Sequence, residues 1–209
     1  MANLLYIESS PRKARSHSSA VAEVFLTAYQ AAHPADRIER LDLWATDLPR
    51  FDGEALNAKY SIMHGGQPSA SEQAAWRDIE LVFQRFNASD KYLFSVPMWN
   101  FGLPYKLKKY IDVITQPGLA WSFDPASGNY TGLVRGRATV IYSSGGMYHA
   151  GSGAEAFDLQ KPAFQNWLSF IGVADVTAIT VAGTLFGPEA IAQARGEAEA
   201  QARKAAAIF

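Results

Sequence analysis

The sequence contains no cysteine, and this absence excludes several kinds of site at once. Disulfide bonds, thiolate zinc sites, iron–sulfur clusters and cysteine nucleophiles all require that residue. The chain also lacks a Walker lysine motif, a Gly-x-Ser-x-Gly motif and a zinc-binding histidine motif. These absences argue against a nucleoside triphosphatase and against a hydrolase.

Neither sign of charge is in excess, because 19 Lys and Arg stand against 20 Asp and Glu. Without a broad basic field the chain is not expected to bind nucleic acid, and without an acidic excess no acidic tail is expected. No apolar stretch approaches membrane-spanning length, so no membrane contact is expected. The first residues lack the basic region and the long apolar run of a signal peptide, which predicts a cytoplasmic protein.

The chain does have enough length and apolar content for one core. Its 209 residues suit a single domain, 1–209, and 48% of them are hydrophobic. Short apolar runs bounded by turn residues predict five strands, most of them fully buried. These predicted strands are 4–7, 37–43, 92–96, 138–142 and 176–182.

Five helical patterns alternate with these strands. Ser69 and Glu72 have the spacing of a capping box, and Gly187-Pro188 opens an alanine-rich final helix. Residues 44–68 are predicted to form a long loop with room for one short helix. The alternation predicts an α/β fold with a parallel sheet that is covered on both faces.

Ligands of such sheets bind beyond the carboxyl ends of the strands, near a switch point in the strand order. Three segments follow predicted buried strands and are therefore the places to search. We call them the serine loop (9–19), the aromatic loop (97–104) and the glycine loop (143–153).

The serine loop combines hydroxyl groups with the cations Arg12, Lys13 and Arg15 in an otherwise neutral chain. Hydroxyls and the free N–H groups of a helix start are suited to a phosphate. The alternative is that one serine merely caps the helix, whatever the function.

The aromatic loop places two aromatic residues, a methionine and an asparagine between Pro97 and Pro104. This much apolar surface at a sheet edge suits a planar ligand whose polar rim meets backbone N–H groups. The alternative is that Trp99 and Phe101 fill the core.

The glycine loop begins with two serines and then Gly145 and Gly146, which would let the backbone approach a flat ligand closely. A plain turn is the alternative. His149 follows in the same loop and is a candidate proton donor, although a lone histidine is more often incidental.

Together the three loops resemble the flavin-mononucleotide motifs of NAD(P)H-dependent azoreductases, a family within the flavodoxin-like quinone reductases. The resemblance covers almost the whole chain and is most specific in the Pro-Met-aromatic-Asn-Phe segment, 97–101. Trp99 and Ser144 stand where familiar members carry a tyrosine and a basic residue, and both lie at the expected flavin edge.

This resemblance implies a flavodoxin-like three-layer sandwich with a five-stranded parallel sheet in the order 2-1-3-4-5. It also implies an FMN cofactor, NADH or NADPH as electron donor, and a quinone or azo compound as acceptor. Two-electron hydride transfer would follow a ping-pong scheme. Members of the family are homodimers with active sites at the subunit interface.

The resemblance also implies roles for individual residues, without a certain catalytic residue or a metal. The FMN phosphate would be held by Ser10, Ser16, His17 and Ser18. The flavin ring and ribityl chain would pack along Pro97, Met98, Trp99, Asn100 and Phe101. The pyrimidine end would meet Ser143, Ser144, Gly145 and Gly146. The substrate cavity would include Trp121, Phe123 and His149, unless Trp121 and Phe123 form a small hairpin on the core.

An electron-transfer flavoprotein in the style of flavodoxin is the alternative function. Such carriers are usually shorter and strongly acidic for docking to partners. The near-zero net charge and the extra cavity-forming segments of this chain favour the enzyme.

Overall fold

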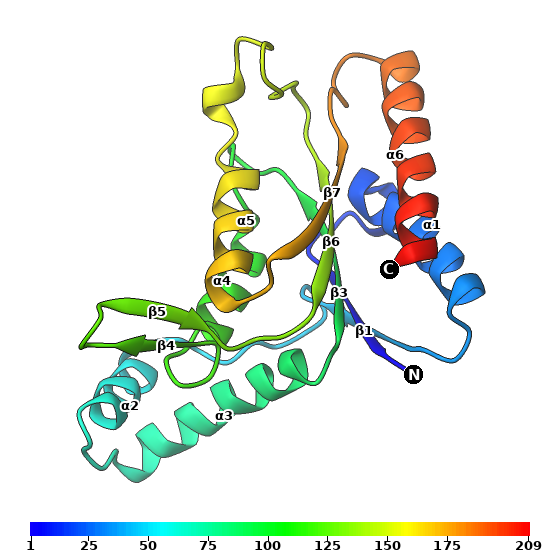
Figure 1. Ribbon diagram of the computed structural model, residues 1–209. Coiled ribbons are helices and arrows are strands. Elements are labelled where there is room, and N and C mark those ends of the chain that lie inside the picture. Colours follow the sequence, from blue (N-terminus) through cyan, green and yellow to red (C-terminus); the bar gives the residue numbers. More distant parts are fainter.

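A parallel five-stranded sheet forms the centre of the molecule (Figure 1). The computed structural model describes residues 1–209. The strands are β1 (Asn3–Glu8), β2 (Arg37–Asp42), β3 (Lys91–Pro97), β6 (Arg137–Ser143) and β7 (Asp175–Val181). They lie side by side in the order β2-β1-β3-β6-β7, and every pair is parallel. The predicted order 2-1-3-4-5 and the flavodoxin-like fold class are confirmed.

Helices cover both faces of this sheet (Figure 1). One face packs against α1 (His17–Ala32) and α6 (Pro188–Ile208). The other face packs against α3 (Ala70–Asn87), α4 (Tyr105–Ile114) and α5 (Gln160–Ile171). Side chains of β1 alternate between the two apolar clusters, with Leu4 and Tyr6 in one and Leu5 and Ile7 in the other. A strand segment buried on both faces must be apolar at every position, as residues 4–7 of β1 are.

Two segments between the main elements form structure of their own. α2 (Gly53–Met63) is the short helix for which residues 44–68 had room, and it packs against α3. The capping box that starts α3 is confirmed, because Ser69 Oγ accepts from Glu72 N and Ser69 N donates to Glu72 Oε2. β4 (Trp121–Asp124) and β5 (Asn129–Gly132) pair as an antiparallel hairpin. Two short 3-10 turns complete the fold, η1 (Lys13–Arg15) and η2 (Glu155–Phe157).

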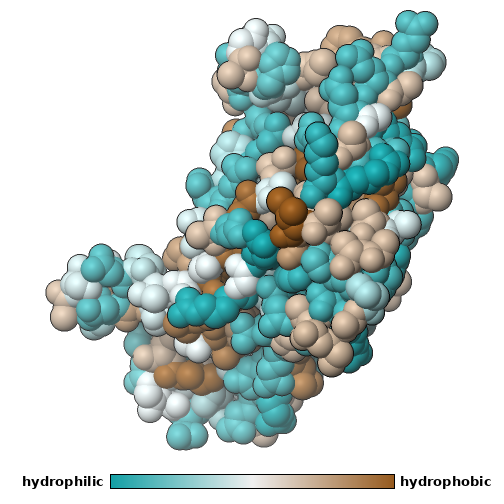
Figure 2. Space-filling view, turned by 45° about the vertical axis from the view of Figure 1, so that its right-hand side comes forward, coloured by the Kyte–Doolittle hydropathy of each residue, from teal (hydrophilic) through white to brown (hydrophobic).

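All five main strands end at the same edge of the sheet, which we call the carboxyl edge; the opposite one is the amino edge. From β1 the chain moves outward to β2, whereas from β3 it moves the other way to β6. The serine loop and the aromatic loop therefore leave the sheet on either side of the switch point. Every helix falls short of the length or the hydrophobicity that a membrane span requires. On the face that Figure 2 shows, hydrophobic residues lie in small patches among hydrophilic ones.

Candidate active site

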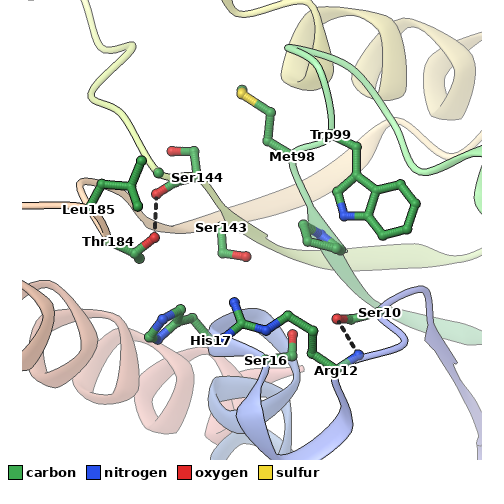
Figure 3. A pocket seen from close by; sticks show the side chains of 12 residues that line it. Ser10, Arg12, Ser16, His17, Met98, Trp99, Ser143, Ser144, Thr184 and Leu185 are labelled. Atoms are coloured by element: carbon green, nitrogen blue, oxygen red, sulfur yellow. Dashed lines mark hydrogen bonds between the residues drawn. The ribbon is translucent and has the colours of Figure 1, made fainter.

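A cavity of about 220 Å³ opens at the carboxyl edge, and the three loops line it together. In Figure 3, the serine loop lies below the cavity, Met98 and Trp99 lie above it, and Ser143 and Ser144 lie beside it. Its lining residues are Ser10, Arg12, Ser16, His17, Pro97, Met98, Trp99, Ser143, Ser144, Gly145, Thr184 and Leu185. One polar part of the lining follows β1, and the main apolar part follows β3.

The polar part surrounds the N-terminus of α1. Ser16 is the N-cap residue, and its hydroxyl accepts from the backbone N–H of Ser19 at 3.3 Å. The hydroxyl of buried Ser18 lies 3.2 Å from that of Ser16. The N–H groups of His17 and Ser18 donate to no protein acceptor, as expected for the first turn of a helix. Capping and anion binding are therefore compatible here, because the cap leaves two donors free.

The three cations of the serine loop have different surroundings. Lys13 forms ion pairs with Glu8 and Asp42 and is therefore engaged by the protein itself. The side chain of Arg12 instead extends along the cavity toward His17, and it pairs with no carboxylate (Figure 3). Partial burial, with the nearby guanidinium groups of Arg12 and Arg195, lowers the pKa of His17. At neutral pH His17 is therefore predominantly an uncharged hydrogen-bonding group beside a positive charge.

The apolar part of the lining ends in a strained turn. Trp99 and Gly102 exchange two backbone hydrogen bonds of 3.0 and 2.9 Å across the two residues between them. Those residues, Asn100 and Phe101, have φ values of 47° and 68°. Two positive φ values define a tight hairpin turn that Asn tolerates and that costs a bulky residue about 1–3 kcal/mol. The N–H groups of Asn100 and Phe101 donate to no protein acceptor and remain available to a ligand.

The glycine loop is braced by the chain that follows β7. Thr184 N and Leu185 N donate to the carbonyls of Ser144 and Gly145 at 3.2 and 3.1 Å. A Cβ on Gly145 would lie 2.8 Å from Leu185 Cδ1, but that atom ends an exposed, flexible side chain, so the fold itself does not require a glycine here. The N–H groups of Gly145 and Gly146 donate to no protein acceptor. The loop is thus more than a plain turn, since it also presents two free donors near the cavity.

This geometry is accompanied by a clear relationship to known proteins. The family model described as "Flavodoxin-like fold" matches residues 2–206. An "FMN-dependent NADH:quinone oxidoreductase" of Desulfotalea psychrophila is 50% identical over 186 residues, which are 88% of this chain and 87% of that protein. A protein of the same name from Nitratidesulfovibrio vulgaris is 43% identical over 211 residues, which are 100% of each chain. The chain belongs to the FMN-dependent NADH:quinone oxidoreductase family.

Solved structures agree with this assignment of the family and its fold. The chain superimposes on an FMN-dependent NADH-azoreductase of Bacillus anthracis, solved in complex with FMN, with a TM-score of 0.85 and 25% identity. That match covers 99% of this chain and 100% of the azoreductase. The predicted resemblance to azoreductases and flavodoxin-like quinone reductases is confirmed.

Of the cofactor residues predicted from the resemblance to this family, nine line the cavity. Ser18, Asn100, Phe101 and Gly146 do not, although each lies within a loop that does. Prediction from the sequence missed Thr184 and Leu185, which lie beyond the end of β7. Ligands of parallel sheets bind beyond the carboxyl ends of the strands, and this rule applies to β7 as it does to β1, β3 and β6. The sequence therefore contained enough information to include the segment after β7. Contact of these residues with FMN stays a prediction.

The residues that were predicted to line the substrate cavity lie outside this cavity of the chain. Trp121 packs against Tyr130 and Phe170 at ring-centroid distances of 5.5 and 5.6 Å, as part of the β4–β5 hairpin. Phe123 is 47% exposed on the same hairpin. His149 is exposed, its Nδ1 lies 3.0 Å from the carbonyl oxygen of Ala150, and it lines a separate cavity of about 270 Å³. Their roles toward a substrate stay predictions.

Proposed function

We propose that this protein is an FMN-dependent NADH:quinone oxidoreductase that passes two electrons from NADH to a quinone. One observation carries the proposal: a single cavity joins a polar helix N-terminus to an apolar aromatic wall. A phosphate suits the first and a planar ring suits the second. FMN contains both groups, and relatives that match along the whole chain carry FMN and NADH in their name.

The side chains and free N–H groups of the cavity fit FMN. Ser10, Arg12, Ser16 and His17 would hold the phosphate, because they surround two unpartnered helix N–H groups. Bound FMN would supply the redox chemistry. Met98 and Trp99 would orient the ring and exclude water from one side of it. The N–H groups of Gly145 and Gly146 would stabilise negative charge at the pyrimidine end without an ionisable catalyst.

We extend the proposal to azo compounds as acceptors. A planar aromatic acceptor uses the same apolar wall as a quinone, and the B. anthracis protein of similar structure is named an NADH-azoreductase. Full cleavage of an azo bond to amines takes two rounds of two-electron transfer, so NADH consumption should be two per azo bond. Donor and acceptor would occupy one place in turn, which predicts parallel lines in initial-rate plots.

We also propose that a second copy of the chain covers the surface beside the cavity. Phe101 and Phe157 form an exposed aromatic pair with centroids 5.4 Å apart, and they are 44% and 56% exposed. Large exposed apolar side chains at one place are typical of interfaces. Trp121 and Phe123 would then reach a substrate cavity only from the second copy. Sedimentation should give twice the chain mass of 22.8 kDa, and a fully active monomer would contradict the dimer.

The first experiment is the visible absorption spectrum of the purified protein, recorded anaerobically before and after addition of NADH. We expect a two-band flavin spectrum that bleaches, followed by reoxidation when a quinone is added. A spectrum that NADH leaves unbleached would favour NADPH as the donor or the electron carrier as the function. A protein that is colourless and does not take up added FMN would overturn the proposal.

A further inference from the structure

We infer that Trp44 is a positioning residue of the active site, which holds the serine loop and the aromatic loop at a fixed separation. Trp44 lies just after β2 and does not line the cavity. Its indole Nε1 donates to the carbonyl of Ser9 at 2.9 Å. Ser9 is fully buried where β1 ends, so this bond fixes the start of the serine loop.

The same indole ring also contacts the apolar wall of the cavity. Trp44 lies 5.7 Å from Trp99, centroid to centroid, with the ring planes tilted by 46°. Tyr105, at the start of α4, packs edge-on to Trp44 at 5.3 Å. Tilted and edge-to-face ring pairs of this kind contribute stability beyond the area they bury. The Trp44 side chain thus contacts both Ser9, the first residue of the serine loop, and Trp99 of the aromatic loop.

Trp44 is itself held by a set of contacts that returns to the serine loop. Its backbone N–H donates to Asp42 Oδ1 at 2.9 Å, and Asp42 forms an ion pair with Lys13. Glu8 and Asp42 are direct neighbours in the register of β1 and β2, so two negative charges lie side by side there. Lys13 bridges both and removes their repulsion. The serine loop is therefore attached to Trp44 at Ser9 and, through Asp42, at Lys13.

The inference rests on the proposed function, because its consequence concerns a ligand with two different ends. A ligand that places a phosphate in the serine loop and a ring on the aromatic loop gains affinity from both contacts only when the two loops are already at the correct separation. Preorganisation of this kind reduces the ordering that binding would otherwise require. Riboflavin, which lacks the phosphate, needs only one of the two loops and gains little from Trp44.

The test compares FMN with riboflavin in two matched variants of the full chain. Trp44→Phe keeps an aromatic ring beside Trp99 and removes the N–H donor to Ser9. Trp167→Phe removes an equivalent indole bond, from Nε1 to Thr115 Oγ1 at 2.8 Å, in α5 away from the cavity. Fluorescence titration of the apoproteins gives both dissociation constants, and thermal unfolding of the apoproteins gives their stability.

We expect Trp44→Phe to weaken FMN about fivefold and riboflavin less than about twofold, from the usual effect of one hydrogen bond. Trp167→Phe should lower the melting temperature of the apoprotein about as much as Trp44→Phe does, and it should leave the affinities for FMN and riboflavin unchanged. Equal losses for FMN and riboflavin, or unchanged FMN affinity, would overturn the inference and leave the proposed function standing. A wild-type protein that binds neither flavin would overturn both.

A second variant keeps the test informative where Trp44→Phe folds poorly. Asp42→Asn leaves every aromatic contact in place and breaks only the attachment through Lys13. It should also weaken FMN more than riboflavin, by about two- to threefold. An Asp42→Asn protein that binds FMN as tightly as the wild type would contradict the role assigned to the attachment.

Discussion

The two ends of α1 lie in opposite environments, although one helix connects them. At the carboxyl edge His17 begins the helix and lines the cavity. At the amino edge His33 follows the helix, and its Nε2 lies 3.2 Å from the carbonyl oxygen of Ala206. The first histidine faces a place for a ligand, whereas the second contacts another part of the same chain.

The polar groups around Asp36 at the amino edge are satisfied by the protein. Asp36 accepts from Tyr29 Oη at 2.6 Å, from Ala2 N at 2.7 Å and from Lys91 Nζ at 3.3 Å. The hydrogen bond from Tyr29, then that from Ala2, holds the pKa of Asp36 well below its usual value of 3.8. Here the hydrogen-bond donors and acceptors pair with each other within the chain, so none of these groups is left for a ligand.

The carboxyl edge is built in the opposite way. The N–H groups of Asn100, Phe101 and Gly145 have no protein acceptor, and Phe101 holds a positive φ that a phenylalanine rarely adopts. Strain and free donors persist only where the surrounding structure stabilises them, and they cluster at binding sites. The comparison shows that the amino edge of the sheet contributes stability, whereas the carboxyl edge of the same sheet keeps groups free to bind a ligand.

A glycine at each edge allows the strongest test of this difference. Gly136 precedes β6 at the amino edge with a φ of 127°, and a Cβ there would overlap the backbone carbonyl oxygen of Asp90. Gly136→Ala should therefore lower the free energy of unfolding by about 3 kcal/mol, from strain and overlap together. Urea unfolding of the apoprotein measures this loss.

Gly196→Ala is the matched control for that substitution. Gly196 lies within α6 with open space around it, so an alanine there should add about 0.5–1 kcal/mol of stability. FMN affinity should be unchanged in both variants, because neither position lines the cavity. A large loss of FMN affinity in the folded Gly136→Ala protein would contradict the division between the edges.

Gly145→Val should show the reverse pattern at the carboxyl edge. The new Cβ meets the side chain of Leu185, which is 86% exposed and can swing away at little cost to the fold. The branched side chain then occupies space beside the cavity, so FMN affinity should fall about tenfold, or about 1.4 kcal/mol. Equal losses of apoprotein stability and FMN affinity would indicate that the glycine serves only the turn.

Local patterns in the sequence predicted the parts of the site that depend on one strand and the loop behind it. Buried apolar runs located β1, β3 and β6, and the residues after them line the cavity. The contribution of Trp44 depends instead on the neighbouring strand β2 and on a bond to Ser9, 35 residues away. The pairing of Lys13 with Asp42 likewise requires the β1–β2 register, which no local pattern contains.

The position of the β4–β5 hairpin was equally beyond local patterns. The family resemblance suggests Trp121 and Phe123 as substrate-cavity residues, with a small hairpin on the core as the alternative. Packing of Trp121 on Phe170 of α5 places the hairpin beside the end of that helix. Only knowledge of the α5 position, or of a second copy, could have located it.

Replacement of Asp36 should affect stability at the amino edge in a pH-dependent manner. Its folded pKa lies below the ordinary 3.8, so its contribution is present above that pH and is lost as the pH falls through the folded pKa. Asp36→Asn should lower the melting temperature of the apoprotein by about 5 °C at neutral pH, and less below about pH 4. FMN affinity should not change.

Asp112→Asn is the control for Asp36→Asn. Asp112 pairs with Lys108 on an exposed helix face, where such ion pairs contribute little to stability. The melting temperature of the Asp112→Asn protein should therefore be nearly that of the wild type. A pH-independent difference between wild type and Asp36→Asn would show that the carboxylate charge is not what stabilises this edge.

His17 offers the smallest and most selective test. Burial and two nearby guanidinium groups lower its pKa, so the free protein holds it mostly neutral at pH 7. A bound phosphate dianion favours the charged imidazolium, so protonation and FMN binding should strengthen each other. Relative to His17→Gln, the wild type should gain about threefold in FMN affinity between about pH 7.5 and about pH 6.

The ratio of wild-type to variant affinity is the informative quantity, because the phosphate itself takes up a proton near pH 6. The effect of that lost ligand charge on the helix N–H groups and Arg12 is common to both proteins and cancels in the ratio. His33→Gln, at the other end of the same helix, should give a pH profile that matches the wild type. If His17→Gln also matched it, the phosphate would bind through the helix N–H groups and Arg12 alone, without help from the imidazole.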